Sequence, residues 1–108
     1  MIYDVYGYSE PSLGDEAGKL ADALDVDWVK HESDYRGVYL AARPRTGAGE
    51  LRLQSNDLRD GDDEYFQEPD FPECRYLLFV DQFDRPDEVR TKLAPLPQWR
   101  FLYRSVVD

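Results

Sequence analysis

Carboxylates supply most of the side chains in this chain that could do chemistry, and they are concentrated in residues 57–73. This stretch, DLRDGDDEYFQEPDFPE, holds eight acids against the single base Arg59, so seventeen residues carry a formal charge of −7. Like charges at this density repel one another in a compact state and produce a strong field for a cationic partner. Three aromatic residues, of a kind that anchors interfaces, lie among the acids: Tyr65, Phe66 and Phe71.

The composition of this stretch favours binding over catalysis. Its two prolines stiffen the chain, which lowers the entropy lost on docking, and solvation alone does not require the aromatic residues. Two alternatives stay open: a loop that only keeps the protein soluble, and a role for Phe66 or Phe71 in covering the edge of a sheet. The candidate partner-binding residues are Asp60, Asp62, Asp63, Glu64, Tyr65, Phe66, Glu68 and Asp70.

A metal site is a weaker interpretation of the same acids. A calcium-binding EF-hand loop needs acidic or amide ligands at alternate positions, a central Gly and a closing bidentate Glu. Aligned from Asn56, the third and twelfth positions are Leu58 and Gln67, so the closing Glu is missing. A single histidine and a single cysteine make zinc less favoured still. A carboxylate pair for glycoside hydrolysis stays an alternative on abundance alone. We expect no metal and no cofactor.

The nucleophiles offer no catalytic signature. His31 is the only histidine, Ser33 follows it two residues later, and no Gly-x-Ser-x-Gly motif is present. Cys74 has no base beside it in the sequence, and a nucleophile needs such a base within hydrogen-bond reach. We therefore interpret His31 as a strand or turn residue and expect no catalytic residues. A small metal-dependent or His31-dependent enzyme domain remains the alternative.

Length and charge narrow the class of protein. At 108 residues the chain fits one domain, and its formal charge of −10 disfavours nucleic acid and anionic membranes as partners. A basic protein surface is the natural complement. One cysteine fits a reducing compartment, and the sequence shows neither a signal peptide nor a long apolar run. We expect a cytoplasmic single domain over residues 1–108.

The pattern of apolar residues in the first half predicts four strands and a helix. Strands are predicted at 2–8, 26–32, 38–42 and 50–55, the last with Leu51, Leu53 and Ser55 inward and Glu50, Arg52 and Gln54 facing water. Ala17, Leu20, Ala21 and Leu24 have helical spacing, and Ser12 with Asp15 resembles a capping box. This predicts a helix over 14–24.

The second half predicts a buried strand, a helix and a final strand. Residues 75–80 are almost continuously apolar, which is typical of a central strand buried on both faces. Asp84 can cap a helix that has Pro86 in its first turn and that Pro95 and Pro97 end. A last strand is predicted over 99–107, with Trp99, Phe101 and Tyr103 on one face.

These elements, in the order β-α-β-β-β-β-α-β, predict an α+β two-layer sandwich. Sequential hairpins imply a mostly antiparallel sheet, and both helices should cover one face of it, because each must bury an apolar stripe. The acidic stretch 57–73 becomes a long connection within the domain. The order of the strands in the sheet does not follow from this pattern.

Several of these segments together resemble a known family. The run His31–Tyr39 has the form H-x-S-x-Y-x-G-x-Y, and it is followed by LRLQSN at 51–56, EPDFP at 68–72 and the strand LLFV at 77–80. With the closing helix and strand, the pattern over about residues 28–107 is similar to small bacterial immunity proteins of polymorphic-toxin and contact-dependent inhibition systems.

The resemblance implies a cytoplasmic inhibitor that binds one cognate toxin, with no enzymatic activity and no cofactor. Immunity families diverge most at the binding surface, so no contact residue is transferred by motif. The charge argument points to a basic, nuclease-like toxin whose active site the acidic stretch occludes. A regulatory or scaffolding module with another partner is the third alternative.

Overall fold

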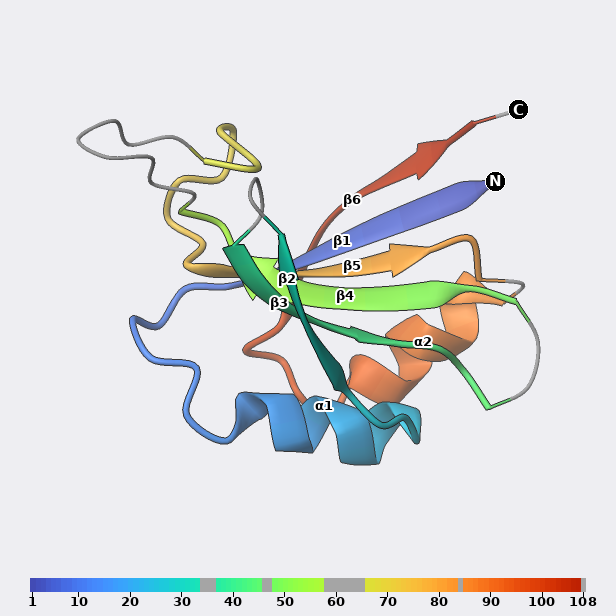
Figure 1. Ribbon diagram of the computed structural model, residues 1–108. Coiled ribbons are helices and arrows are strands. Elements are labelled where there is room, and N and C mark those ends of the chain that lie inside the picture. The colour runs from blue at the N-terminus through green and yellow to red at the C-terminus, as the bar shows by residue number, and fades with distance from the viewer. Residues whose placement is uncertain (34–36, 46–47, 58–65, 84, 108) are drawn as a thin grey trace.

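The computed structural model describes residues 1–33, 37–45, 48–57, 66–83 and 85–107, and in this part of the chain it has six strands and two helices (Figure 1). The predicted order of elements is confirmed. The elements are β1 (Ile2–Tyr8), α1 (Glu16–Leu24), β2 (Val29–Ser33), β3 (Gly37–Ala42), β4 (Glu50–Ser55), β5 (Tyr76–Asp81), α2 (Pro86–Leu93) and β6 (Arg100–Val106).

The six strands form one sheet in the order β2-β3-β4-β5-β1-β6, and every neighbouring pair is antiparallel. β5 lies between β4 and β1, so the predicted central strand is confirmed. Its residues 77–80 are all buried, although successive side chains point to opposite faces of the sheet. Both faces of β5 are therefore covered.

Both helices cover one face of the sheet, as predicted (Figure 1). The side chains between helices and sheet form the larger apolar cluster, in which Tyr8 and Trp99 stack with ring centres 5.0 Å apart. Its buried members are Tyr6, Tyr8, Leu20, Leu24, Val26, Ala42, Leu51, Leu53, Leu78, Val80, Val89, Leu93 and Trp99. Neither helix of the described chain is long and apolar enough to cross a membrane.

An ion pair ties the sheet to α2 on this same face. Asp4 on β1 is fully buried, and Arg104 on β6 donates to both of its carboxylate oxygens, at 2.7 and 2.9 Å. The Arg104 guanidinium also donates to Asp87 in the first turn of α2, at 2.9 Å. The buried carboxylate is thus compensated by a bidentate partner, which is the geometry that makes burial of a charge tolerable.

Two predicted element starts are wrong. α1 begins at Glu16, not at 14, because Gly14 has a left-handed φ of 56° and the side chain of Asp15 makes no capping hydrogen bond. The second strand begins at Val29, not at 26. Asp25 is left-handed (φ 53°), and the Val26 N–H donates to the Ala21 carbonyl, so Asp25 and Val26 cap the end of α1 and are not part of a strand. Asp84, the predicted cap of the second helix, lies outside the described residues.

Two predicted strand faces are also wrong. Gln54 does not face water: it is 2% exposed. In β6, Phe101 and Tyr103 do not share a face, because the pairing with β1 shifts by one residue. Tyr6 pairs with Phe101 but Val5 pairs with Tyr103, so Leu102 is the extra residue of a β-bulge. Phe101 consequently packs under the helices and Tyr103 on the opposite face.

Candidate functional site

The sheet face opposite the helices, here called the helix-free face, has a smaller apolar cluster. Its buried members are Val5, Cys74, Leu77 and Phe79, with Phe71, Leu102 and Tyr103 packed against them. Phe71 comes from the acidic connection and Cys74 directly follows it, and neither residue belongs to a strand. The second half of the connection is therefore part of the folded structure. Phe71 covers apolar side chains of the sheet, which is the alternative role considered for it above.

One buried residue, Asn56, holds this half of the connection in place. Its side-chain amide donates to the carbonyls of Phe71 at 3.0 Å and Cys74 at 2.9 Å, and its side-chain oxygen accepts from the Glu68 N–H at 2.8 Å. Its backbone N–H donates to the Arg75 carbonyl and its own carbonyl accepts from Gln67, both at 2.9 Å. Asn56 is fully buried, so it satisfies the polar backbone of a segment that has no ladder of its own.

The two ends of the charged part of the connection meet at the sheet. Asp57 and Phe66 form an isolated antiparallel bridge, which closes the segment 58–65. In the sequence this segment has four acids against Arg59, a net charge of −3 from 1 − 4. The predicted site residues Asp60, Asp62, Asp63, Glu64 and Tyr65 fall in it and lie outside the described residues.

The three described candidates differ in availability. Asp70 is exposed, whereas Phe66 and Glu68 are half-buried. Glu68 accepts a 2.6 Å hydrogen bond from the Tyr103 hydroxyl, and Phe71 stacks on the Tyr103 ring with centroids 6.1 Å apart. Burial, followed by the contact with Glu68, raises the pKa of Tyr103 above its ordinary value. Glu68 thus fastens the connection to β6 with its carboxylate.

A second ion pair fastens the connection near its end. Arg100 on β6 donates to the Glu73 carboxylate at 2.7 Å. The backbone N–H of Glu73 itself, together with this bond from Arg100, lowers the pKa of Glu73. Both Tyr103 and Arg100 come from β6, so the edge strand of the sheet carries two of the fastenings of the connection.

Close packing seats the thiol of the connection on β1. Cys74 is 1% exposed, and a Cβ atom built on Gly7 would lie 2.4 Å from its sulfur. No real Cβ could occupy that place, so only glycine at position 7 admits Cys74 to the sheet.

Polar side chains of β4 continue the helix-free face beyond the apolar cluster. The Arg52 guanidinium lies 4.3 Å from the centre of the Phe79 ring, and its Nε donates to the Gln54 side-chain oxygen at 2.8 Å. The Gln54 amide nitrogen is buried and has no hydrogen-bond partner in the described structure. An unpaired buried donor costs about 1–3 kcal/mol, so a hydrogen-bond acceptor that reached the Gln54 amide would stabilise the structure here.

His31 lies at the β2 edge of the sheet. It is exposed and stacks on Tyr39 of β3, with ring centroids 5.3 Å apart and planes at 15°. The contact is that of a cross-strand aromatic pair and gives the imidazole no hydrogen-bonded nucleophile. Over the described residues, no group of three or more His, Cys, Asp or Glu side chains is placed to hold a metal ion.

The sequence indicated the acidic connection but not its fastenings. Asn56 lies in the LRLQSN segment and Tyr103 in the alternating run 99–107. Neither pattern indicates their partners, which are backbone groups and side chains far along the chain. One feature of the sequence pointed to Asn56: it is a polar residue that directly follows the predicted strand 50–55, in which Leu51 and Leu53 face inward.

No protein-family model matches the chain, and comparison with the curated proteins and with the solved structures found no significant match either.

Proposed function

We propose that this chain is a protein-binding module, an immunity protein that binds and neutralises a cognate basic, nuclease-like bacterial toxin in the cytoplasm. The observation that carries the proposal is the closure of segment 58–65 by the Asp57–Phe66 bridge, supported by the buried Asn56. A connection that served only solubility would not need a buried residue to hold its base. The resemblance to immunity proteins described above supports the same function.

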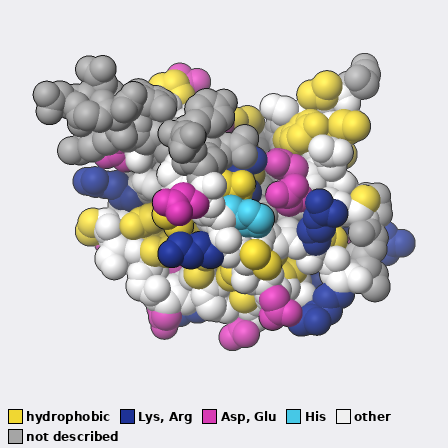
Figure 2. Space-filling model, viewed as in Figure 1, with side chains coloured by type: hydrophobic (Ala, Val, Ile, Leu, Met, Phe, Trp, Pro, Cys, Tyr) yellow, Lys and Arg dark blue, Asp and Glu magenta, His cyan; other side chains and the backbone are white. Residues whose placement is uncertain are grey.

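The charge of the closed segment gives the recognition mechanism. A nuclease binds the phosphates of its substrate in a cationic groove, and the carboxylates Asp60, Asp62, Asp63 and Glu64 would occupy that groove in place of phosphate. Opposite fields steer such partners together and raise association rates to about 10⁸–10⁹ M⁻¹s⁻¹ at low salt. On the side drawn in Figure 2, acidic and basic side chains of the described residues are interspersed, so no acidic patch of theirs competes there with the connection.

Aromatic residues and fixed ends supply the rest of the affinity. Tyr65 and Phe66 are the anchors of the proposed interface, because aromatic side chains at the centre of an interface contribute most of its binding energy. Asp70 extends the acidic surface on the exposed side of the connection. The bonds of Asn56 order the base of the connection before the partner arrives, so less entropy is lost on binding.

The first test is capture of the partner. Tagged protein is incubated with lysate of its own organism at low and moderate salt, and the bound proteins are identified by mass spectrometry. We expect one basic toxin, retained at moderate salt. Many basic proteins that all wash away at moderate salt would contradict the proposal.

The second test measures association kinetics with the captured partner. The double variant Asp62→Lys/Asp63→Lys should slow association about tenfold at low salt and change dissociation much less, because steering acts before contact. Its matched control is Glu10→Lys/Asp22→Lys, which makes the same charge change at two exposed acids elsewhere. Equal slowing by both pairs would show that only net charge matters, and the acidic connection would not be the binding site.

A further inference from the structure

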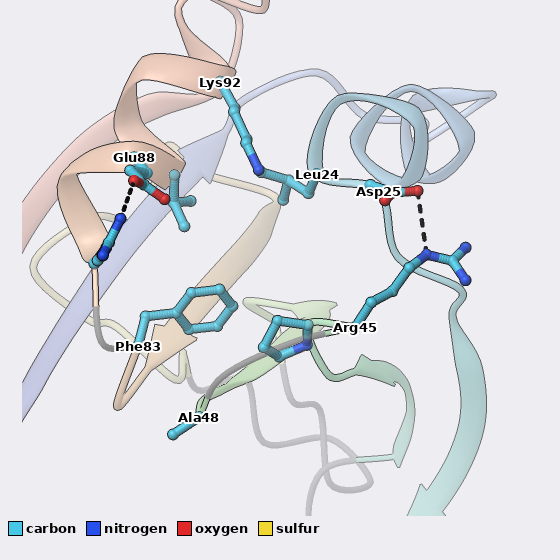
Figure 3. Close-up of a pocket in the computed structure, with 10 residues that line it drawn as sticks. Leu24, Asp25, Arg45, Ala48, Phe83, Glu88 and Lys92 are labelled. Atoms are coloured by element: carbon cyan, nitrogen blue, oxygen red, sulfur yellow. Dashed lines mark hydrogen bonds and ion pairs between the residues drawn. The ribbon is translucent and has the colours of Figure 1, made fainter.

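A cavity of about 460 Å³ lies at the opposite end of β4 from the acidic connection, and Figure 3 shows the side chains that line it. Small-molecule sites in proteins typically have about 300–1,000 Å³. The cavity opens between the end of α1, the β3–β4 loop, the β5–α2 link and α2. Its lining residues are Leu24, Asp25, Pro44, Arg45, Ala48, Phe83, Arg85, Glu88, Val89 and Lys92.

One part of the wall of this cavity is apolar, and the rest is formed by charged side chains. Leu24 and Val89 are buried members of the larger cluster, contributed by α1 and α2. Phe83 packs directly on the backbone of Gly49: a Cβ atom at that position would lie 2.4 Å from the ring, and the Gly49 φ is +128°. The ring is thereby held as a flat wall that cannot approach the helices further without losing this contact.

The rim of the cavity concentrates cations in an acidic protein. Arg45 is held by Asp25 at 3.2 Å and by Asp27 at 3.3 Å, and Arg85 by Glu88 at 3.1 Å. Lys92 is exposed, and its side chain extends from α2 towards Leu24 at the end of α1 (Figure 3). Among the described residues no ion pair of Lys92 is found, so its ammonium is available to a ligand at the mouth.

We infer that this cavity binds a small organic anion with a flat apolar body, such as an aromatic carboxylate. The body would lie between Phe83 and the Leu24–Val89 wall, and the anionic group would meet the Lys92 ammonium. A guanidinium has five N–H donors, so Arg45 and Arg85 keep donors for the ligand while they are held by carboxylates. The acidic surface elsewhere repels the same ligand, which makes this rim the favoured place for it.

This inference is independent of the proposed function. The β3–β4 loop precedes Glu50 and the acidic connection follows Ser55, so the two sites lie at opposite ends of β4, about 17–20 Å apart for a strand of this length. A ligand in the cavity would not touch the acidic connection, and either site can fail its test alone.

The test is an NMR titration of the isotope-labelled full chain with naphthoate. We expect saturable shifts of the amides of Leu24, Ala48 and Val89, with a dissociation constant of about 1 mM or lower. Naphthylmethylamine, which has the same ring system with a positive charge, should give no saturable shift at these amides. An absence of saturable naphthoate shifts, or equal shifts by the cation, would overturn the inference.

Two lysine variants sharpen the test. Lys92→Met keeps the apolar stem and removes the charge, and it should weaken naphthoate binding about fivefold. The control Lys30→Met removes an exposed lysine of β2 that does not line the cavity, and it should leave binding unchanged. If the two variants bind naphthoate equally, Lys92 does not meet the anion and the site is not the one inferred here.

Discussion

The two faces of the sheet are closed by different means. In the described part of the chain, thirteen buried residues from six elements and the loops between them form one continuous cluster under the helices. On the helix-free face the cluster has four buried residues, one of which is Cys74, and Phe71 of the connection packs against them. Polar contacts also hold the connection to this face, namely the hydrogen bonds of Asn56 and the Tyr103–Glu68 hydrogen bond. The first face holds most of the buried apolar side chains, whereas the second holds the base of the acidic connection against the sheet.

Adjacent leucines of β5 test this comparison most strongly. Leu78 faces the helices and Leu77 faces the connection, and both are fully buried. Leu78→Ala should lower the free energy of unfolding by about 3–5 kcal/mol, because sheet and helices cannot close around the cavity it leaves. Leu77→Ala should cost less, about 2–3 kcal/mol, because the connection can move inward. Urea unfolding measures both, and a larger loss for Leu77→Ala would reverse the assignment of the two faces.

Loss of the Asn56 hydrogen bonds should lower the free energy of unfolding less than Leu78→Ala does. Its effect should be concentrated in the acidic connection. Asn56→Ala leaves the Phe71 and Cys74 carbonyls and the Glu68 N–H without their partner, which we expect to cost about 2–3 kcal/mol. Hydrogen exchange of the Glu68 and Gln67 amides should accelerate more than that of β5 amides such as Leu78.

Asn56→Asp provides a second variant for this experiment. The aspartate keeps an oxygen to accept from the Glu68 N–H, but it brings an unpaired buried charge against the Phe71 and Cys74 carbonyl oxygens, so exchange should be at least as fast as in Asn56→Ala. Uniform acceleration across the whole sheet would mean that the connection does not open as a separate unit.

The smallest expected effects concern two tyrosine hydroxyls. Tyr103→Phe should cost about 1 kcal/mol at neutral pH, because its hydrogen bond to Glu68 is lost. Burial raises the pKa of Tyr6 to about 12 and also raises the pKa of Tyr103, both from an ordinary value of 10.0. Above pH 10 the unfolded chain therefore releases protons that the folded chain keeps, so folding stability falls as the pH rises.

The two hydroxyls differ in their partners, which provides the control. In the described structure the Tyr6 hydroxyl is buried under the helices without a hydrogen-bond partner. Tyr6→Phe should thus be nearly neutral at pH 7, while both single variants should flatten the alkaline loss of stability. Thermal unfolding measured at neutral and alkaline pH separates the two; equal costs at neutral pH would contradict the role given to Glu68.

The sequence patterns predicted the elements and their layers because these follow from local spacing. The alternation in 50–55, the apolar run before Asp81 and the helical stripe of Leu20 and Leu24 each report which side of an element is buried. The position of β5 between β4 and β1 could not be predicted, since strand order depends on pairing between distant segments. The bulge at Leu102 was equally invisible, and it turned Tyr103 towards the connection.

For the candidate site, the sequence indicated where the charge lies but not what holds it. The acids of 57–73 could be counted, and their meaning as a binding surface remains a proposal. The sequence offered Asn56 only as the first position of a failed calcium-loop alignment and as the end of the LRLQSN segment, because a buried amide looks like any loop residue until its backbone partners are known. The Gln54 prediction failed for a related reason: alternation assigns a residue to a face, but it does not say what covers that face.

Because Cys74 is buried against Gly7, the reactivity of its thiol can report local opening of the structure. Cys74 is the single thiol of the chain, and its sulfur is enclosed by β1 on one side and by its own segment on the other. A reagent in solution can meet this sulfur only in the moments when the segment lifts from the sheet. The rate at which a reagent modifies the native thiol thus reports how often this segment separates from the sheet, without any substitution in the chain.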